Sequence, residues 1–140
     1  MKRSSRRKFL TGAATLGAAA MVSTTASAES CENISAHLPK LVHKVFFWLK
    51  NPDSEADRMA LIKGLKTLAA IETVRAIHVG IPASTEKRDV VNNSYQVSEM
   101  LLFDDVEGQN IYQTHPIHLK FVEDCSHLWR EVVVYDSIAV

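Results

Sequence analysis

Apolar residues follow two patterns along the first half of this 140-residue chain. From Leu41 to Leu49 they fall on both alternating faces, which predicts a strand covered on both sides. Ser54 and Asp57 then form the N-cap pattern of a helix. Apolar positions at helical spacing follow as far as Ile71, namely Met59, Ile62, Leu65, Leu68 and Ala69. The pattern therefore predicts a strand followed by a helix.

The second half of the chain contains further strand-like runs and an interrupted helix. The runs cover residues 73–79, 95–103 and 130–136. A polar loop over 84–93 separates the first two. The helical region before the last run is divided by Pro116, because proline fits the first turn of a helix and not its middle. His115 is therefore expected at the junction between two helical pieces.

The order strand, helix, strand, strand, helix, strand is that of the α+β, ferredoxin-like β-α-β-β-α-β fold. We expect a four-stranded antiparallel sheet with two helices on one face. The first strand also carries Phe46 and Trp48 on the face opposite His43, so the second face of the sheet needs cover as well. A second copy of the sheet is the simplest cover, which predicts a homodimer in the form of a dimeric α+β barrel.

The N-terminal residues have the features of an export signal. Ser5-Arg6-Arg7-Lys8-Phe9-Leu10 is a twin-arginine (Tat) motif, and a short, weakly apolar stretch leads from it to the cleavage site Ala26-Ser27-Ala28. We expect a signal peptide over 1–28, a polar leader over 29–40, a domain over 41–136 and a C-terminal tail over 137–140. The protein is then periplasmic or otherwise exported, with no membrane association after cleavage.

Removal of residues 1–28 changes the charge of the chain, because this segment holds five basic residues and no acidic one. The other 112 residues are enough for one small domain and carry 11 basic and 16 acidic side chains, a net charge of −5. No basic patch is left to bind phosphates, so nucleic acid is not an expected partner. The two cysteines, Cys31 and Cys125, either form a disulfide in an oxidising compartment or stay as one exposed and one buried thiol.

The residues most informative for chemistry lie around Pro116. Tyr112, His115 and His118 place a phenol and two imidazoles beside the helix break. A neutral imidazole in a partly apolar pocket can abstract a proton near neutral pH, and a phenol can polarise a carbonyl. The alternative is structural, with His115 as a helix cap and both other rings as core. No metal site is expected, because no Cys or Asp accompanies the two histidines, and no cofactor is implied.

Four features carry a resemblance to a known family. They are His43 in the first strand, Tyr95 at the start of the third, the His115-Pro116-Ile117-His118 motif and the closing Val-Val-Tyr-Asp. Over residues 41–136 the chain resembles the stress-responsive A/B barrel (Dabb) domain proteins. The resemblance implies a dimeric α+β barrel. It implies no single activity, because the family includes plant stress proteins, a plant polyketide cyclase and bacterial members without an assigned role.

The resemblance to the cyclase indicates candidate catalytic residues. Its tyrosine and two of its histidines fall on Tyr112, His118 and His43 here, while a further pocket histidine falls on Val97. By alternation Glu99 lies on the same strand face as Val97, so it can enter the same pocket. The expected binding residues are Glu99, Val97, Phe47 and His115. The side chains expected to converge on one cavity between sheet and helices are His43, Glu99, Tyr112 and His118.

Two functional classes fit these features. The first is an exported homodimer that binds a small, largely apolar molecule between sheet and helices, with acid–base chemistry of the cyclase or isomerase type. The second is a non-enzymatic stress-response or interaction protein whose pocket is packed core. The sequence names neither a ligand nor a reaction.

Overall fold

β1 (Leu41–Leu49) lies at the centre of the sheet. A computed structural model describes residues 38–140, and in it β1 pairs with a neighbouring strand on each side. All pairings are antiparallel, and the strand order is β2-β3-β1-β4. The other strands are β2 (Ala76–Gly80), β3 (Val97–Phe103) and β4 (Trp129–Ile138). This is the ferredoxin-like arrangement that the sequence predicts.

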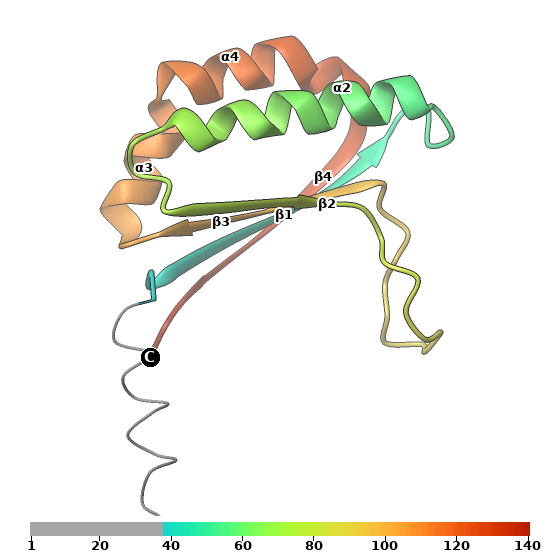
Figure 1. Cartoon of the computed structure of the whole chain (residues 1–140), viewed down its shortest axis with the longest axis horizontal. Helices are drawn as coiled ribbons and strands as arrows, with labels where there is room; N and C mark the ends of the chain where they lie inside the picture. Colours follow the sequence, from blue (N-terminus) through green and yellow to red (C-terminus); the bar gives the residue numbers. More distant parts are fainter. Residues whose placement is uncertain (1–37) are drawn as a thin grey trace, which may run out of the picture.

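The described helices cover one face of this sheet (Figure 1). They are α2 (Glu55–Lys66) with its 3-10 extension η1 (Thr67–Ala70), α3 (Val106–Thr114), α4 (Pro116–Cys125) and the 3-10 turn η2 (Ser126–Leu128). Ser54 caps α2, because its side-chain oxygen accepts a hydrogen bond from the backbone N–H of Asp57 at 3.2 Å. Within residues 38–140, each helix is too short or too polar to span a lipid bilayer.

Strand alternation divides β1 between two environments. Every second residue from Leu41 to Leu49 is buried under the helices, whereas Phe46 and Trp48 lie on the opposite face. β3 alternates in the same way and buries its own apolar residues on the helix side. The buried apolar side chains of both strands form one core with those of the helices. His43 and Glu99 are therefore held inside an apolar layer.

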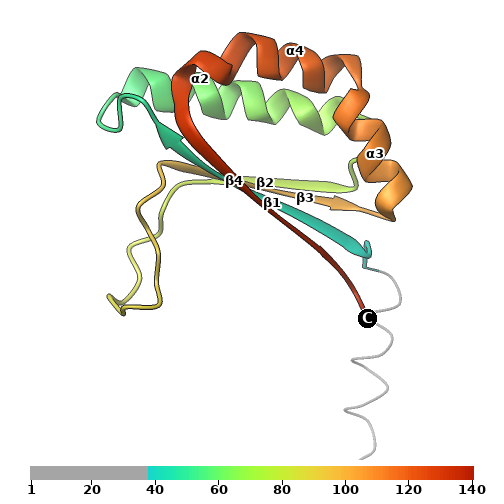
Figure 2. The ribbon, with the colours of Figure 1, turned by 180° about the vertical axis from the view of Figure 1, so that it is seen from behind.

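The face of the sheet away from the helices carries an aromatic cluster. Phe46 contacts Tyr95 and Tyr135, with ring centroids 4.9 and 6.1 Å apart. Trp48 donates a hydrogen bond from its indole N–H to the Ser94 hydroxyl at 3.0 Å. The loop between β2 and β3 extends on this side of the sheet in both ribbon views (Figures 1 and 2). This cluster, Phe46, Trp48, Tyr95 and Tyr135, is called the open-face cluster below.

The helical region is interrupted between α3 and α4 at the predicted position. Pro116 is the first residue of α4, and His115 before it is extended, with φ −66° and ψ 137°. The ring Nδ1 of His115 accepts a hydrogen bond from the backbone N–H of Ile117 at 3.2 Å and so caps α4. Its Nε2 lies 3.3 Å from a carboxylate oxygen of Glu72. His115 therefore holds the break in place.

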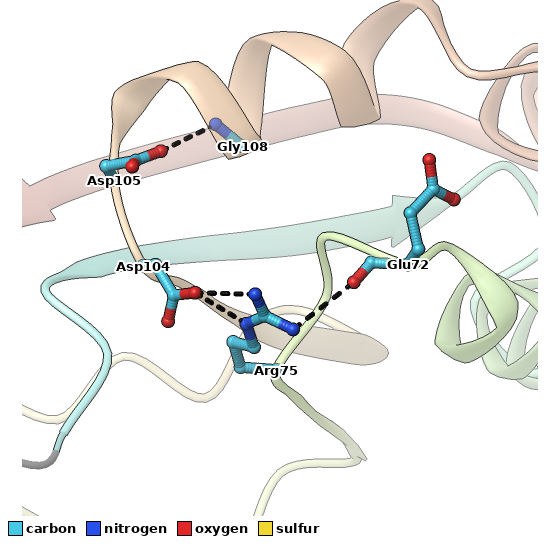
Figure 3. Close-up of polar contacts among 5 residues, drawn as sticks. All are labelled: Glu72, Arg75, Asp104, Asp105 and Gly108. Carbon is cyan, nitrogen blue, oxygen red and sulfur yellow. Dashed lines mark hydrogen bonds and ion pairs between the residues drawn. The ribbon is translucent and has the colours of Figure 1, made fainter.

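The start of α3 is fixed by two neighbouring aspartates (Figure 3). The side chain of Asp105 accepts a hydrogen bond from the N–H of Gly108 at 2.8 Å and caps α3. The side chain of Asp104 accepts from Nε and Nη2 of Arg75, at 2.7 and 2.6 Å. Arg75 Nη1 also donates to the carbonyl oxygen of Glu72 at 3.5 Å. These contacts join the turn between β3 and α3 to the segment before β2.

Several boundaries differ from the sequence prediction. β2 begins at Ala76 and β3 at Val97, later than predicted, because the ladder pairs of these strands begin there. β4 runs to Ile138, which pairs with Leu41, so residues 137 and 138 belong to the sheet and not to a tail. The expected signal over 1–28, most of the leader and Cys31 lie outside the described residues. Cys125 is buried and forms no disulfide with another residue of 38–140.

Candidate functional site

A pocket of about 260 Å³ lies between the sheet and the helices α3 and α4. Its polar lining consists of His43 from β1, Glu99 from β3, Tyr112 and Gln113 from α3, and His118 from α4. Residues that are far apart in the sequence thus meet in one place. Strand alternation places His43 and Glu99 on the helix side of the sheet, and the helix break brings the residues from α3 and α4 together.

The walls of this pocket are apolar. They are formed mainly by Val45, Phe47, Phe121, Trp129, Val132 and Val134. Trp129 packs against Phe47 and Phe121, with ring centroids 5.2 and 5.9 Å apart. The volume exceeds the roughly 150 Å³ of an engineered cavity that holds benzene, and it falls just below the roughly 300 Å³ at which pockets for drug-sized ligands begin. The pocket therefore suits a molecule with about one substituted ring.

Tyr112 connects the two imidazoles of the pocket. Its ring centroid lies 5.8 Å from that of His43 and 4.5 Å from that of His118. Tyr112 is only 1% exposed, and burial, followed by the charge of Glu99, raises the pKa of its phenol. The hydroxyl is therefore protonated at neutral pH and can donate a hydrogen bond to a ligand oxygen.

His118 has a defined tautomer because of its backbone partner. Its Nδ1 lies 3.0 Å from the carbonyl oxygen of Gln113, which can only accept, so Nδ1 carries the proton. Burial lowers the pKa of His118; the Gln113 bond opposes this shift and His43 adds to it. The neutral ring therefore has its lone pair on Nε2. This is the form of imidazole that acts as a general base.

His43 is oriented by a carboxylate from the edge of the sheet. Its Nδ1–H donates to Asp136 on β4 at 2.6 Å. His43 and Asp136 are direct cross-strand partners, so the strand register itself places the two side chains together. In the neutral ring this leaves Nε2 as the nitrogen with the free lone pair. The carboxylate thus holds the ring in one orientation and one tautomer.

Glu99 is the least compensated polar group of the pocket. It is 3% exposed, and its Oε1 is buried without a hydrogen-bond partner among residues 38–140. Burial raises the pKa of its carboxyl to about 8. Glu99 is therefore largely a neutral carboxylic acid at pH 7. In this form it has one O–H donor, which a carboxylate lacks.

The sequence matches a known protein family. Residues 41–139 match the family described as the stress responsive A/B barrel domain, Dabb. The chain belongs to the Dabb family. The match extends three residues beyond the domain end expected at residue 136, in agreement with the longer β4. Comparison with curated proteins gave no match.

Several solved structures share the fold of this Dabb chain. A Dabb protein with a ferredoxin-like fold from Mesorhizobium loti has a TM-score of 0.59 at 23% identity, covering 73% of this chain and 98% of that chain. A hydroxynitrile lyase from Passiflora edulis has 0.60 at 20%, covering 73% and 95%. A dimeric ferredoxin-like protein of unknown function from Thermobifida fusca has 0.58 at 17%, covering 74% and 93%. At these identities the likeness concerns the fold.

Two of the residues expected to bind a ligand in the Dabb pocket do not line it. Val97 is fully buried and pairs with Phe47 at one end of the sheet core, where it packs as an apolar residue. His115 is absent from the lining, and its ring caps α4 and lies beside Glu72. Phe47 lines the pocket, together with the polar residues His43, Glu99, Tyr112 and His118. The catalytic and binding roles of these side chains are still predictions.

The sequence interpretation missed Asp136 and much of the pocket wall. Asp136 was recognised only as part of a closing motif, and its contact with His43 depends on the register between β1 and β4. Alternation along β4 was the available signal for Val132 and Val134, since both lie on the same strand face as Asp136. Trp129 begins β4 one residue before the predicted start of that strand.

A larger groove of about 680 Å³ lies between α2, η1 and α4. The helices approach closely here, because a Cβ on Gly64 would lie 2.5 Å from the Cys125 sulfur. Burial, followed by Asp124, raises the pKa of the Cys125 thiol, so its reactive thiolate form is disfavoured. The lining of this groove includes no imidazole or phenol, so the smaller pocket is the better candidate for chemistry. Residues 38–140 contain no cluster of three or more side chains suited to hold a metal ion.

Replacing Glu99 with Gln should stabilise the protein, and more so at pH 8.5 than at pH 4.5. The folded-state pKa of about 8 lies above the ordinary value of 4.5, so the folded state binds the proton more tightly than the unfolded state does. The contribution of Glu99 to stability therefore falls as pH rises from about 4.5 to about 8, by up to about 4 kcal/mol. Gln has the same shape and does not ionise, so the unfolding free energy of the variant does not fall in this way as pH rises.

The measurement is chemical unfolding of wild type and Glu99→Gln at both pH values. Glu123→Gln is the matched control, because Glu123 is exposed on α4. A difference in unfolding free energy between wild type and Glu99→Gln that does not change with pH would show that Glu99 ionises normally.

Proposed function

We propose that this Dabb protein binds a small, largely apolar molecule in the pocket between sheet and helices and performs acid–base chemistry on it. The observation that carries the proposal is the arrangement of His43, Tyr112 and His118. Two imidazoles, each with its Nδ1–H engaged elsewhere, flank one buried phenol on an apolar wall. Such a set can remove a proton from a ligand and stabilise the oxygen that becomes negative.

The roles follow from the hydrogen bonds of each group. Nε2 of His118 is the general base, because its Nδ1–H is held by the carbonyl of Gln113. The Tyr112 hydroxyl donates a hydrogen bond to a carbonyl or hydroxyl oxygen of the ligand. His43, held by Asp136, exchanges a second proton. These groups could remove a proton from a hydroxyl or an acidic C–H of the ligand and return a proton to the product. Reactions of this type are enolisation, cyclisation, isomerisation and the reversible cleavage of a bond to a carbon that carries a hydroxyl.

The shared fold with a hydroxynitrile lyase supports this reaction class. The competing proposal is a non-enzymatic stress-response or interaction protein, and the 1% exposure of Tyr112 favours it, since a catalytic phenol must reach its ligand. The two proposals differ in what a small ligand does. A ligand that binds the folded state raises the melting temperature, whereas packed core gives no response.

His118→Ala should strongly reduce turnover while leaving ligand binding and the fold in place. A panel of one-ring hydroxynitriles and hydroxyketones, with mandelonitrile as the first probe, is screened by thermal shift and then for product. We expect wild type to respond in both assays and the variant to lose about 100-fold or more of its rate, the usual contribution of a general base. His127→Ala is the control, because His127 is exposed on η2 outside the pocket. Equal turnover in His118→Ala would remove this residue from the mechanism.

We infer that the open-face cluster is the contact surface of a homodimer. Tyr135 of this cluster is 62% exposed and its other members are partly exposed, and an apolar patch in contact with solvent is typical of an interface. The fold neighbour from Thermobifida fusca is described as dimeric. Trp48→Glu should convert the dimer to a monomer, because it introduces a charge that an apolar interface cannot solvate. Light scattering over a range of protein concentrations measures the mass. Leu119→Glu, on the exposed side of α4, is the control. A wild-type mass equal to one chain would contradict the dimer.

We infer that the twin-arginine signal exports the protein. The motif is a signal recognised by the export machinery and is separate from the 41–139 family match.

Replacing both Arg6 and Arg7 with Lys should leave the full-length precursor in the cytoplasm, whereas the Arg3→Lys variant, changed outside the pair, should be exported normally. Cell fractionation and the mass of the exported form give the result. Export of the double variant at the wild-type level would indicate a different route.

A further inference from the structure

Glu99 is surrounded by groups that do not compensate its carboxyl. Its direct cross-strand neighbours are Val45 on β1 and Val79 on β2. The other titratable side chains that line the pocket are His43 from β1, Tyr112 from α3 and His118 from α4. Neither Lys nor Arg occurs in the lining, so no permanent positive charge faces Glu99 there. Its Oε1 is buried without a partner among the described residues.

An unpaired buried carboxyl calls for an explanation, because it destabilises the folded protein. An apolar residue would fit this position of β3, since Val97 and Leu101 share the same strand face and are fully buried. Packing alone therefore does not require a glutamate. A ligand atom that bonds to the carboxyl would satisfy the group, and the carboxyl lines the pocket in which such a ligand would lie.

In their neutral forms, the two imidazoles supply acceptors to the pocket rather than donors. His43 donates its Nδ1–H to Asp136, and His118 donates its Nδ1–H to Gln113. In their neutral forms both present only an acceptor nitrogen to a ligand. When both rings are neutral, the titratable groups that can donate a proton to a ligand oxygen are therefore Tyr112 and Glu99.

We propose that Glu99 donates its carboxyl proton in a hydrogen bond to an oxygen of an uncharged ligand, and so selects neutral oxygen-bearing ligands over hydrocarbons and anions. This inference rests on the proposed function, because it takes the pocket to be a ligand site. It adds a substrate class: an uncharged one-ring compound with an acceptor oxygen. Anions are disfavoured because the lining offers no cation to pair with them.

The selectivity depends on pH. Burial raises the pKa of Glu99 to about 8, so the donor is present at pH 6.5 and lost at pH 9.5. Above this range the carboxylate also repels an electron-rich ligand oxygen. The pKa of His118 is shifted downward from its ordinary value of 6.5, so the neutral ring predominates at both pH values. Binding of a neutral acceptor ligand should therefore weaken as pH rises through about 8.

Three matched probes test the proposal on the folded protein by NMR titration. Acetophenone has a ring and a carbonyl acceptor, ethylbenzene has the same shape without the acceptor, and benzoate has the charge. At pH 6.5 wild type should bind acetophenone about tenfold more tightly than ethylbenzene, the effect of one hydrogen bond. Benzoate should bind at least about tenfold more weakly than acetophenone. The preference for acetophenone should shrink to less than about threefold at pH 9.5.

Two variants isolate the role of Glu99. Glu99→Gln keeps a neutral donor, so its preference for acetophenone should persist at both pH values. Glu99→Met has similar length and no donor, so the preference should be absent at both. Glu123→Gln, on the exposed side of α4, should behave like wild type. The carboxyl ¹³C signal of Glu99 provides a direct readout in wild type and should titrate near pH 8 in the free protein.

The outcomes separate this inference from the proposed function. If neither acetophenone nor ethylbenzene binds, both the ligand pocket and the role of Glu99 are overturned. If both bind with equal affinity, or benzoate binds most tightly, the pocket stands and the role of Glu99 falls. The same holds if Glu99→Met keeps the wild-type preference, or if the Glu99 carbon signal titrates near pH 4.5. Should Glu99→Met fail to fold, the pH dependence of wild type against Glu99→Gln decides.

Discussion

The candidate site depends on the helix break at Pro116. His118 comes six positions after Tyr112, and an unbroken α-helix turns by about 100° per residue, so the two side chains would point about 120° apart around one axis. Only one of them could then face the sheet. The break starts α4 in a new direction, and the two rings meet with centroids 4.5 Å apart. The proline is therefore a constraint on backbone geometry with a direct chemical consequence.

The other side of the pocket places polar groups where the fold would favour apolar ones. His43 and Glu99 lie on the buried faces of the two central strands. Natural proteins accept such local conflicts mainly at functional sites. His43 is compensated by Asp136, whereas Glu99 lacks a hydrogen-bond partner for Oε1 within the described residues. The two groups therefore differ: His43 forms a hydrogen bond with Asp136, whereas Glu99 has a carboxyl oxygen without a hydrogen-bond partner among the described residues.

The sequence predicts those parts of the structure that depend on local rules. The order of strands and helices along the chain, the caps of α2 and α4 and the division at Pro116 follow from alternation, capping patterns and the geometry of proline. Alternation also puts His43 and Glu99 on the face toward the helices. The contact of His43 with Asp136 could not be predicted in this way, because it depends on the register of strands 93 positions apart in the sequence. His115 was assigned to binding from its motif, and only its contact with Glu72 in the folded protein shows where its ring lies.

One wall of the pocket belongs to the edge strand β4, and this affects how the family can evolve. Val132 and Val134 line the pocket and are nevertheless 42% and 46% exposed. Substitutions at exposed positions usually change stability little, whereas changes in the central strands disturb the core. The shape of the cavity can therefore change through mutations at this rim while the polar groups of the pocket stay where the core holds them. A fold with such a tolerant rim can acquire new substrates by small neutral steps, which accounts physically for many activities on one scaffold.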